Sequence, residues 1–119
     1  MGNRYFSEYE MRCKHCGWYI EEPKFLEMLT QARIEADIPF YITSWCRCKS
    51  HDEQLKGSNN HTTGKAVDIA YSTPQSRAKI VFALVRAGFK RIGVDFGHSF
   101  IHVDDNLEDK PYPALWTYS

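Results

Sequence analysis

The sequence has no long apolar run, no excess charge of either sign, and no repeat or low-complexity segment. No stretch approaches the ~20 apolar residues that a helix needs to cross a bilayer, so we expect no membrane partner. The formal net charge is zero, from 15 basic and 15 acidic residues, and a neutral chain has no overall field to attract nucleic acid. Residues 1–8 contain no apolar segment of the signal-peptide kind, so we expect synthesis in the cytoplasm without a signal peptide.

The composition is that of an ordinary globular protein. Apolar residues make up 43% of the 119 positions and charged residues 25%. A chain of this length has room for one small hydrophobic core. We therefore expect a single domain spanning residues 1–119, and we expect it to act as a monomer.

Hydrophobic periodicity predicts an α+β fold. Apolar residues at helical spacing predict two main helices, which begin at Pro23 and at Pro74. A shorter helix is expected from Ser50, which starts a capping-box pattern. Runs of aromatic and β-branched residues predict strands at 40–45, 66–71, 91–94 and 100–104. The expected architecture is a small, mostly antiparallel sheet with the two main helices packed on it. Residues 1–21 are expected to be irregular, and the C-terminal tail, which is rich in Pro and aromatic residues, is expected to wrap the surface.

A carboxylate interrupts one of the apolar strands. Asp68 stands between Val67 and Ile69, and a buried carboxylate is costly unless it is paired or binds a metal. His61 precedes this strand at the end of a Gly/Asn loop, and the small residue Gly64 would allow a ligand to approach the backbone. Taken alone, the segment fits a metal site and a surface His with a strand-edge Asp equally well.

A second segment supplies another imidazole. His102 and Asp104 are two positions apart in the strand 100–104, so both side chains project from the same face of the sheet. His61, Asp68 and His102 together offer two nitrogens and one oxygen. Catalytic zinc sites use three such ligands and leave a fourth position for water, whereas structural zinc sites prefer four protein ligands. The sequence therefore predicts a catalytic zinc.

The pattern Ser58-x-x-His61-x-x-Gly64-x-Ala66-x-Asp68, followed by Phe-Ile-His-Val-Asp at 100–104, resembles a known family. It is similar to the zinc D-alanyl-D-alanine carboxypeptidases and L-alanyl-D-glutamate endopeptidases. The segment 43–48 is also similar to the family's Thr-Ser-Gly-Tyr-Arg segment, at its start and at Arg47. The resemblance implies a zinc in a cleft on the sheet, held by His61, Asp68 and His102. It also implies that Arg47 contacts the substrate or steadies the oxyanion.

The catalytic base does not follow from the resemblance. Many members of the family place it two or three residues before the second His ligand, where this chain has Phe100 and Ser99. Asp104 is the first candidate because it shares a face with His102. His98 is the second, since it lies on the same face if the strand extends back. Asp104 could instead orient a ligating imidazole, and both roles are left open.

Four cysteines form two close pairs in the sequence, Cys13/Cys16 and Cys46/Cys48. In a reducing compartment such pairs are more often metal ligands or free thiols than disulfides. All four could hold a second, structural zinc, and free or partly oxidised thiols are the alternative. His15 is interpreted as a surface residue and His51 as part of the turn around the short helix.

The predicted function is zinc-dependent hydrolysis of the stem peptides of bacterial peptidoglycan by metal-activated water. The bond could be the terminal D-Ala-D-Ala link, the L-Ala-D-Glu link or a cross-link. The alternative is a non-catalytic, zinc-stabilised cell-wall-binding or virion structural domain. A His-Asn-His nuclease is disfavoured, because His61 leads into a strand and the net charge gives no footprint for DNA. Such an enzyme would reach the wall after release or as part of a virion, as a phage endolysin does.

Overall fold

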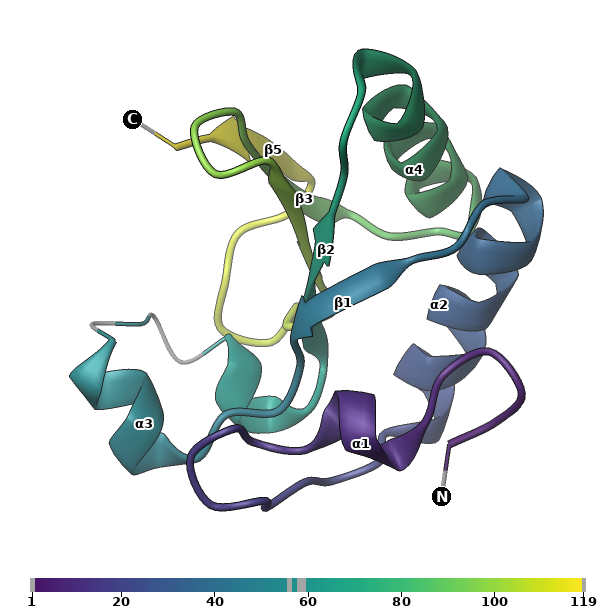
Figure 1. Ribbon diagram of the computed structural model, residues 1–119. Coiled ribbons are helices and arrows are strands. Elements are labelled where there is room, and N and C mark those ends of the chain that lie inside the picture. The colour runs from purple at the N-terminus through teal and green to yellow at the C-terminus, as the bar shows by residue number, and fades with distance from the viewer. Residues whose placement is uncertain (1, 56, 58–59, 119) are drawn as a thin grey trace.

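Five strands form one sheet in the computed structural model, which describes residues 2–55, 57 and 60–118 (Figure 1). Their order across the sheet is β1-β2-β4-β3-β5. All neighbours are antiparallel except β3 and β5, which are parallel. The strands are β1 Tyr41–Ser44, β2 Ala66–Ala70, β3 Arg91–Asp95, β4 Phe100–Asp104 and β5 Ala114–Thr117. The predicted α+β class and the mostly antiparallel sheet are confirmed.

The two main helices lie on the same side of this sheet (Figure 1). Helix α2 runs over Pro23–Ala36 and α4 over Pro74–Arg86, each with Pro in its first turn, as the sequence predicts. A reciprocal capping box between Thr73 and Ser76 satisfies the first turn of α4. Within the described part of the chain, no helix combines the length and the apolar character that a membrane crossing requires.

The hydrophobic core lies between the helices and the sheet. Alternate residues of the central strands belong to it, because successive side chains of a strand point to opposite faces. Those residues are fully or nearly fully buried: Val67, Ile69, Ile92, Val94, Ile101 and Val103. The residues between them, Asp68 on β2 and His102 on β4 among them, project from the face that is turned away from α2 and α4. The packing of the core therefore determines which face carries the polar side chains.

Three shorter helices complete the fold: α1 Glu8–Met11, α3 Lys49–Gln54 and the 3-10 helix η1 His61–Thr63. Of these, α1 adds Met11 to the hydrophobic core. The short helix expected from Ser50 begins earlier, because the Sγ atom of Cys48 accepts the N–H of His51 and so acts as the N-cap. The irregular N-terminal region contains α1, which is capped by Ser7. The predicted loop at 56–60 falls largely outside the described residues.

The C-terminal tail, which the sequence predicts to wrap the surface, contributes the edge strand β5, a strand that the sequence does not predict. Strand β5 pairs with β3 in parallel, with Arg91 opposite Ala114 and Gly93 opposite Trp116. The pairing brings the tail onto the polar face of the sheet, where its aromatic side chains contact the residues of β3 and β4. The tail thus forms part of the surroundings of the candidate site.

Candidate metal centre

The strand register places the candidate ligands side by side. Asp68 on β2 pairs with His102 on β4, and His102 pairs with Gly93 on β3. Gly93 in turn pairs with Trp116, and a Cβ atom at position 93 would overlap the indole ring. The absence of a side chain at Gly93 therefore lets the indole lie across the sheet, with its ring centroid 5.7 Å from that of His102.

His61 reaches the same place from η1. The chain leaves η1 through Gly64, whose φ of 77° lies in the left-handed region, and then enters β2. The buried Trp45 connects this turn to β1 by two hydrogen bonds. Its indole Nε1 donates to the carbonyl oxygen of Gly64 at 3.2 Å, and its own carbonyl oxygen accepts from His61 Nδ1 at 2.8 Å. These bonds fix both the turn and the orientation of the imidazole.

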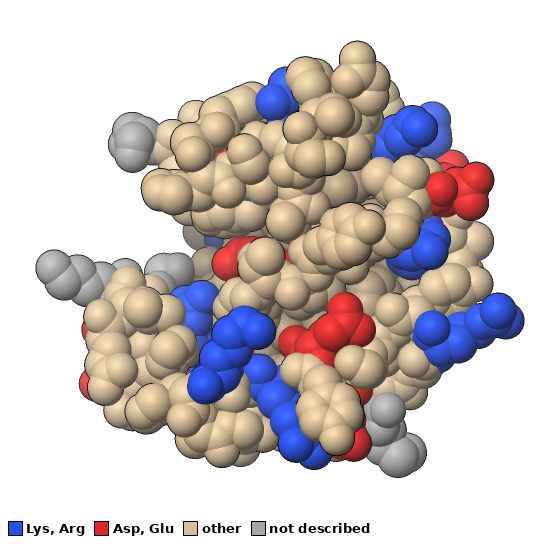
Figure 2. All heavy atoms as spheres, in the orientation of Figure 1, with Lys and Arg blue, Asp and Glu red and all other residues tan. Residues whose placement is uncertain are grey.

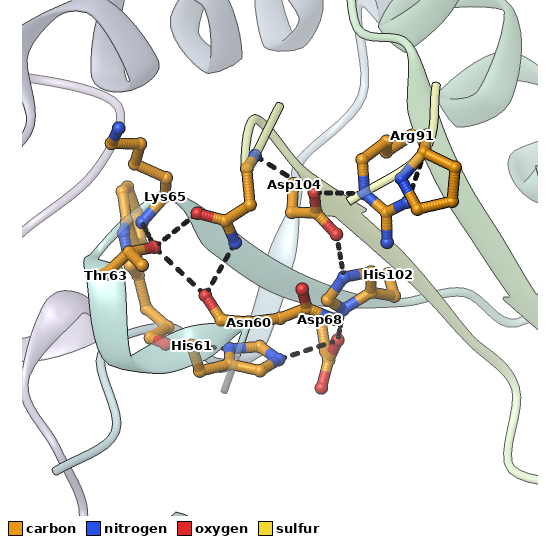
Figure 3. Close-up of polar contacts among 11 residues, drawn as sticks. Asn60, His61, Thr63, Lys65, Asp68, Arg91, His102 and Asp104 are labelled. Atoms are coloured by element: carbon orange, nitrogen blue, oxygen red, sulfur yellow. Dashed lines mark hydrogen bonds and ion pairs between the residues drawn. The ribbon is translucent and has the colours of Figure 1, made fainter. Parts of the chain in front are cut away.

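The three side chains converge on one point above the sheet (Figure 3). Asp68 Oδ1 lies 3.4 Å from His61 Nε2 and 3.0 Å from His102 Nδ1, and one ligand atom from each residue lies within 4.8 Å of the others. Zinc–ligand distances of ~2.0–2.2 Å place neighbouring ligand atoms of a tetrahedral site roughly 3.3–3.5 Å apart. The predicted ligands are therefore brought together at a spacing suited to one metal ion.

The far nitrogens of both imidazoles are committed to other partners. His61 Nδ1 donates to a backbone carbonyl, and His102 Nε2 lies 2.7 Å from Asp104 Oδ2. Donation from these atoms leaves the lone pairs of His61 Nε2 and His102 Nδ1 facing Asp68, which is the tautomeric state that a metal requires. Because both rings are oriented in this way and the donor set is two nitrogens and one oxygen, the residues fit Zn²⁺.

The carboxylate between the two imidazoles stays charged. Burial alone would raise the pKa of Asp68, but its close contacts with the imidazoles of His102 and His61 outweigh burial and hold the pKa far below its usual range. For His102, burial would lower the pKa, yet the carboxylates of Asp104 and Asp68 on its two sides raise it. The site therefore concentrates negative charge around a pair of imidazoles, as a cation site does.

Asp104 has the geometry of an orienting group. Its side chain is 0% exposed, and its Oδ2 atom accepts from His102. Its Oδ1 atom accepts from Arg91 Nε at 2.7 Å and from the Asn106 N–H at 3.1 Å. Both oxygens are thus engaged behind the metal ligands, away from the cavity. These contacts are the ones that orientation of His102 requires, and the choice between orientation and proton transfer stays a prediction.

His98 lies apart from the candidate ligands. Its proposed role required the strand to extend back, but β4 begins at Phe100 and His98 belongs to the turn after β3. The His98 side chain is 84% exposed, and its backbone N–H donates to Asp95 at 2.7 Å. The structure therefore does not bring His98 onto the face that carries His102.

Sequence reasoning missed the polar network behind the ligands (Figure 3). Arg91 is the first residue of β3. It donates from Nε to Asp104 and from Nη1 to the carbonyl oxygen of Pro111 at 2.7 Å. Asn106 donates to the carbonyl oxygen of Asn60 at 2.9 Å and accepts from the hydroxyl of Thr63 at 2.8 Å. The one feature of the sequence that could have indicated this network is Arg91, a charged residue at the start of an otherwise apolar strand.

The ligands open into a cavity of about 280 Å³. Figure 2 shows a hollow between the surface over α3 and the surface over the C-terminal part of the chain. The cavity is lined by Arg47, Leu55, Gly57, Asn60, His61, Asp68, Phe100, His102 and Tyr118. Arg47 thus lines the cavity together with the candidate ligands, and its contact with a substrate or an oxyanion stays a prediction. Tyr118, which sequence reasoning missed, closes another side, and burial raises the pKa of its phenol.

Two side chains hold the Arg47 guanidinium in place. Its Nη1 atom lies 2.9 Å from Oδ1 of the buried Asp52, and its Nη2 atom donates to Ser44 Oγ at 3.1 Å. The backbone N–H of Arg47 also donates to the carbonyl oxygen of His61 at 3.1 Å. The guanidinium is therefore fixed relative to the metal ligands by both its side chain and its backbone.

Three of the four cysteines come together away from this cavity. The Sγ atoms of Cys13, Cys16 and Cys48 form a second group that could hold a metal ion, and Cys46 is not part of it. The Cys46 thiol is buried and lies 3.5 Å from both the N and the O atoms of Ile20. The expected set of four thiols is thus reduced to three.

A comparison with protein-family models matches residues 5–104 to the family described as Peptidase M15. A search of curated protein sequences and a search of solved structures each gave no match. The matched region contains η1, β2 and β4, and therefore all three of the candidate ligands described above. The match covers well over half of the chain, and the chain belongs to the peptidase M15 family of metallopeptidases.

Proposed function

We propose that the protein is a zinc peptidase that hydrolyses peptide bonds in the stem peptides of bacterial peptidoglycan. The observation that carries the proposal is the set of His61, Asp68 and His102. One nitrogen of each imidazole is bonded to another protein group, and the other nitrogen faces Asp68 with its lone pair. Membership of the peptidase M15 family supports hydrolysis of a peptide. The resemblance of the sequence motifs to carboxypeptidases and endopeptidases of the cell wall supports this substrate class.

The bound zinc would supply Lewis acidity and would lower the pKa of its water to about 7. His61, Asp68 and His102 hold the ion, and Asp104 keeps His102 in the tautomer that leaves Nδ1 available. Arg47 presents a fixed positive charge to the cavity. A guanidinium in this position can bind a substrate carboxylate or the developing oxyanion.

Tyr118 completes the polar lining of the cavity. Its raised pKa keeps the phenol protonated at neutral pH, so its hydroxyl can donate a hydrogen bond to the substrate. Among the described residues that line the cavity, no carboxylate other than Asp68 is present. That observation favours a second candidate function, a non-catalytic domain that binds the cell wall and uses zinc for stability.

Purified protein incubated with peptidoglycan separates the two functions. The peptidase is expected to release fragments with new amino termini, and a chelator is expected to stop the release. Mass analysis of the fragments then identifies the bond, since loss of a single terminal D-Ala differs from cleavage at L-Ala-D-Glu or at a cross-link. Binding to peptidoglycan without any fragment would instead support the non-catalytic domain.

Replacement of Arg47 tests the role of the fixed guanidinium. Arg47→Ala is expected to lower kcat by about 10²-fold, which is the order of effect seen when one donor to an oxyanion is removed. The zinc content should not change, because Arg47 is not a ligand. Arg86→Ala is the matched control, because Arg86 forms an exposed ion pair with Glu35 and should retain full activity. Activity of Arg47→Ala equal to that of the control would contradict the assignment.

A further inference from the structure

A second cluster of metal-binding side chains lies at the junction of two segments far apart in the sequence. Cys13 and Cys16 belong to the turn that follows α1, whereas Cys48 is the N-cap of α3. Their three Sγ atoms lie within 4.8 Å of one another, and all three residues are free cysteines. Three thiols at this separation match the donor arrangement of a thiolate metal site.

Backbone N–H groups point at these sulfur atoms. The Cys13 sulfur accepts the N–H of Cys48 at 3.2 Å, and it also accepts from the backbone of His15 and of Cys16. The Cys48 sulfur accepts the N–H of His51 at 3.4 Å. Hydrogen bonds of this kind stabilise a thiolate, which is the form of cysteine that binds a metal. Both the turn at Cys13–Cys16 and the start of α3 therefore direct backbone N–H groups at a cysteine sulfur.

The candidate for a fourth donor is an imidazole next to the cluster. Neither His51 nor His15 belongs to the group of ligand atoms that lie within 4.8 Å of one another, so His51 would move toward the three sulfurs when a metal binds. His51 follows Cys48 with the same spacing that separates Cys16 from Cys13. The Nδ1 atom of His51 is shielded from solvent and has no hydrogen-bond partner among the described residues. The His51 ring stacks on His15 with centroids 5.4 Å apart, and His15 Nδ1 lies 3.3 Å from the Cys48 sulfur. A buried unpaired nitrogen is costly, and coordination to a metal would satisfy it.

We propose that Cys13, Cys16, Cys48 and His51 form a second metal site that takes Zn²⁺ in a structural role. Three thiolates and one imidazole make a closed tetrahedral set, which leaves no position for water or substrate. Binding replaces the three thiol protons with one zinc ion, and those protons pass to the solvent. Soft thiolate donors select zinc over magnesium or calcium.

The site would connect the N-terminal segment to the wall of the hydrolytic cavity. Arg47 directly precedes Cys48, and its backbone N–H bonds the carbonyl oxygen of His61. A metal that fixes Cys48 would therefore also limit the movement of Arg47. The neighbouring surface, which includes Cys16, Trp18 and Arg47, borders a further cavity of about 620 Å³. The second metal would thus stabilise the wall of the cavity next to the zinc on the sheet, and it would not contact the substrate.

Zinc content per chain tests the proposal independently of activity. The wild-type protein, purified under reducing conditions and dialysed, is expected to hold two zinc ions. Cys16→Ser and His51→Ala are each expected to hold one, whereas the control variants His15→Ala and Cys46→Ala should retain two. His61→Ala should also hold one, because it loses the ion on the sheet and keeps the thiolate site.

Cobalt substitution identifies which site remains. A thiolate-to-cobalt charge-transfer band in the near ultraviolet is expected in wild-type protein and in His61→Ala, and it should be lost in Cys16→Ser. A single zinc and no such band in the wild-type protein would overturn the site, as would a disulfide among Cys13, Cys16 and Cys48 in the metal-loaded protein. Loss of one zinc from His15→Ala but not from His51→Ala would overturn the choice of His51. The wild-type spectrum decides the question even if a variant fails to fold.

Discussion

His61→Ala is expected to lose the zinc on the sheet and to reduce hydrolysis of peptidoglycan to the level of the uncatalysed control. His61 supplies one of the three candidate ligand atoms, and among the described residues no further His, Cys, Asp or Glu belongs to this group, so no neighbouring side chain replaces its Nε2 atom. Metal catalysis contributes several kcal/mol of transition-state stabilisation, so the expected fall is roughly 10³-fold or more. Zinc analysis together with an assay of released amino groups measures both effects in one preparation.

His98→Ala is the matched control for this result. It removes the same type of side chain from an exposed turn, where His98 contacts Asp95 rather than the ligands. We expect normal zinc content and normal activity. If His98→Ala keeps its zinc but loses activity, His98 would be assigned as the catalytic base. The turn that carries it would then have to lie closer to the cavity than the structure places it.

Asp104→Asn is expected to weaken zinc binding and to destabilise the fold together. The Asp104 carboxylate is buried and accepts from Arg91 on one oxygen and from His102 on the other. An Asn side chain has only one acceptor oxygen, so it can accept from Arg91 or from His102 but not from both. It also carries no charge, which leaves the buried Arg91 guanidinium without a counter-charge. Breaking a buried ion pair costs about 3–5 kcal/mol of the free energy of unfolding. Loss of an orienting partner lowers metal affinity by roughly 10- to 100-fold.

The zinc dependence of Asp104→Asn distinguishes an orienting group from a base. If Asp104 orients His102, excess zinc should restore much of the activity at a temperature where the variant remains folded. If Asp104 transfers protons, the variant would bind zinc as the wild type does and would stay inactive at saturating zinc. Asp109→Asn, at an exposed position in the segment after β4, provides the control for a change of charge alone.

The ligands could be predicted because their chemistry conflicts with their local environment. Asp68 in an apolar strand is costly unless something binds it, and the alternation of β4 places His102 on the polar face. The residues behind them could not be predicted in the same way. Arg91 meets Asp104 only because β3 and β4 pair in one particular register, with position 91 opposite position 104. That register is set by the turn at 96–99 that joins the two strands, and the strand patterns alone do not specify which residues of β3 and β4 face each other.

The same reasoning explains what was missed in the fold. The tail segment 114–117 is short and follows a Pro-rich stretch, so its local sequence gives little indication of a strand. It becomes one by pairing in parallel with β3, far from it in the sequence. The cysteine spacing suggested four equivalent thiols, yet Cys46 enters the core beside Ile20 while Cys48 caps α3. Spacing alone could not separate these two environments.

Stoichiometric reconstitution of the metal-free protein tests the central claim most directly. The protein is stripped of metal, zinc is added back stepwise, and the release of peptidoglycan fragments is followed alongside the bound zinc. We predict no activity without metal and a rise in activity that follows occupancy of the His61–Asp68–His102 site, with no rise in His61→Ala. Full activity in the metal-free protein, or no fragments from the fully zinc-loaded protein, would contradict the account.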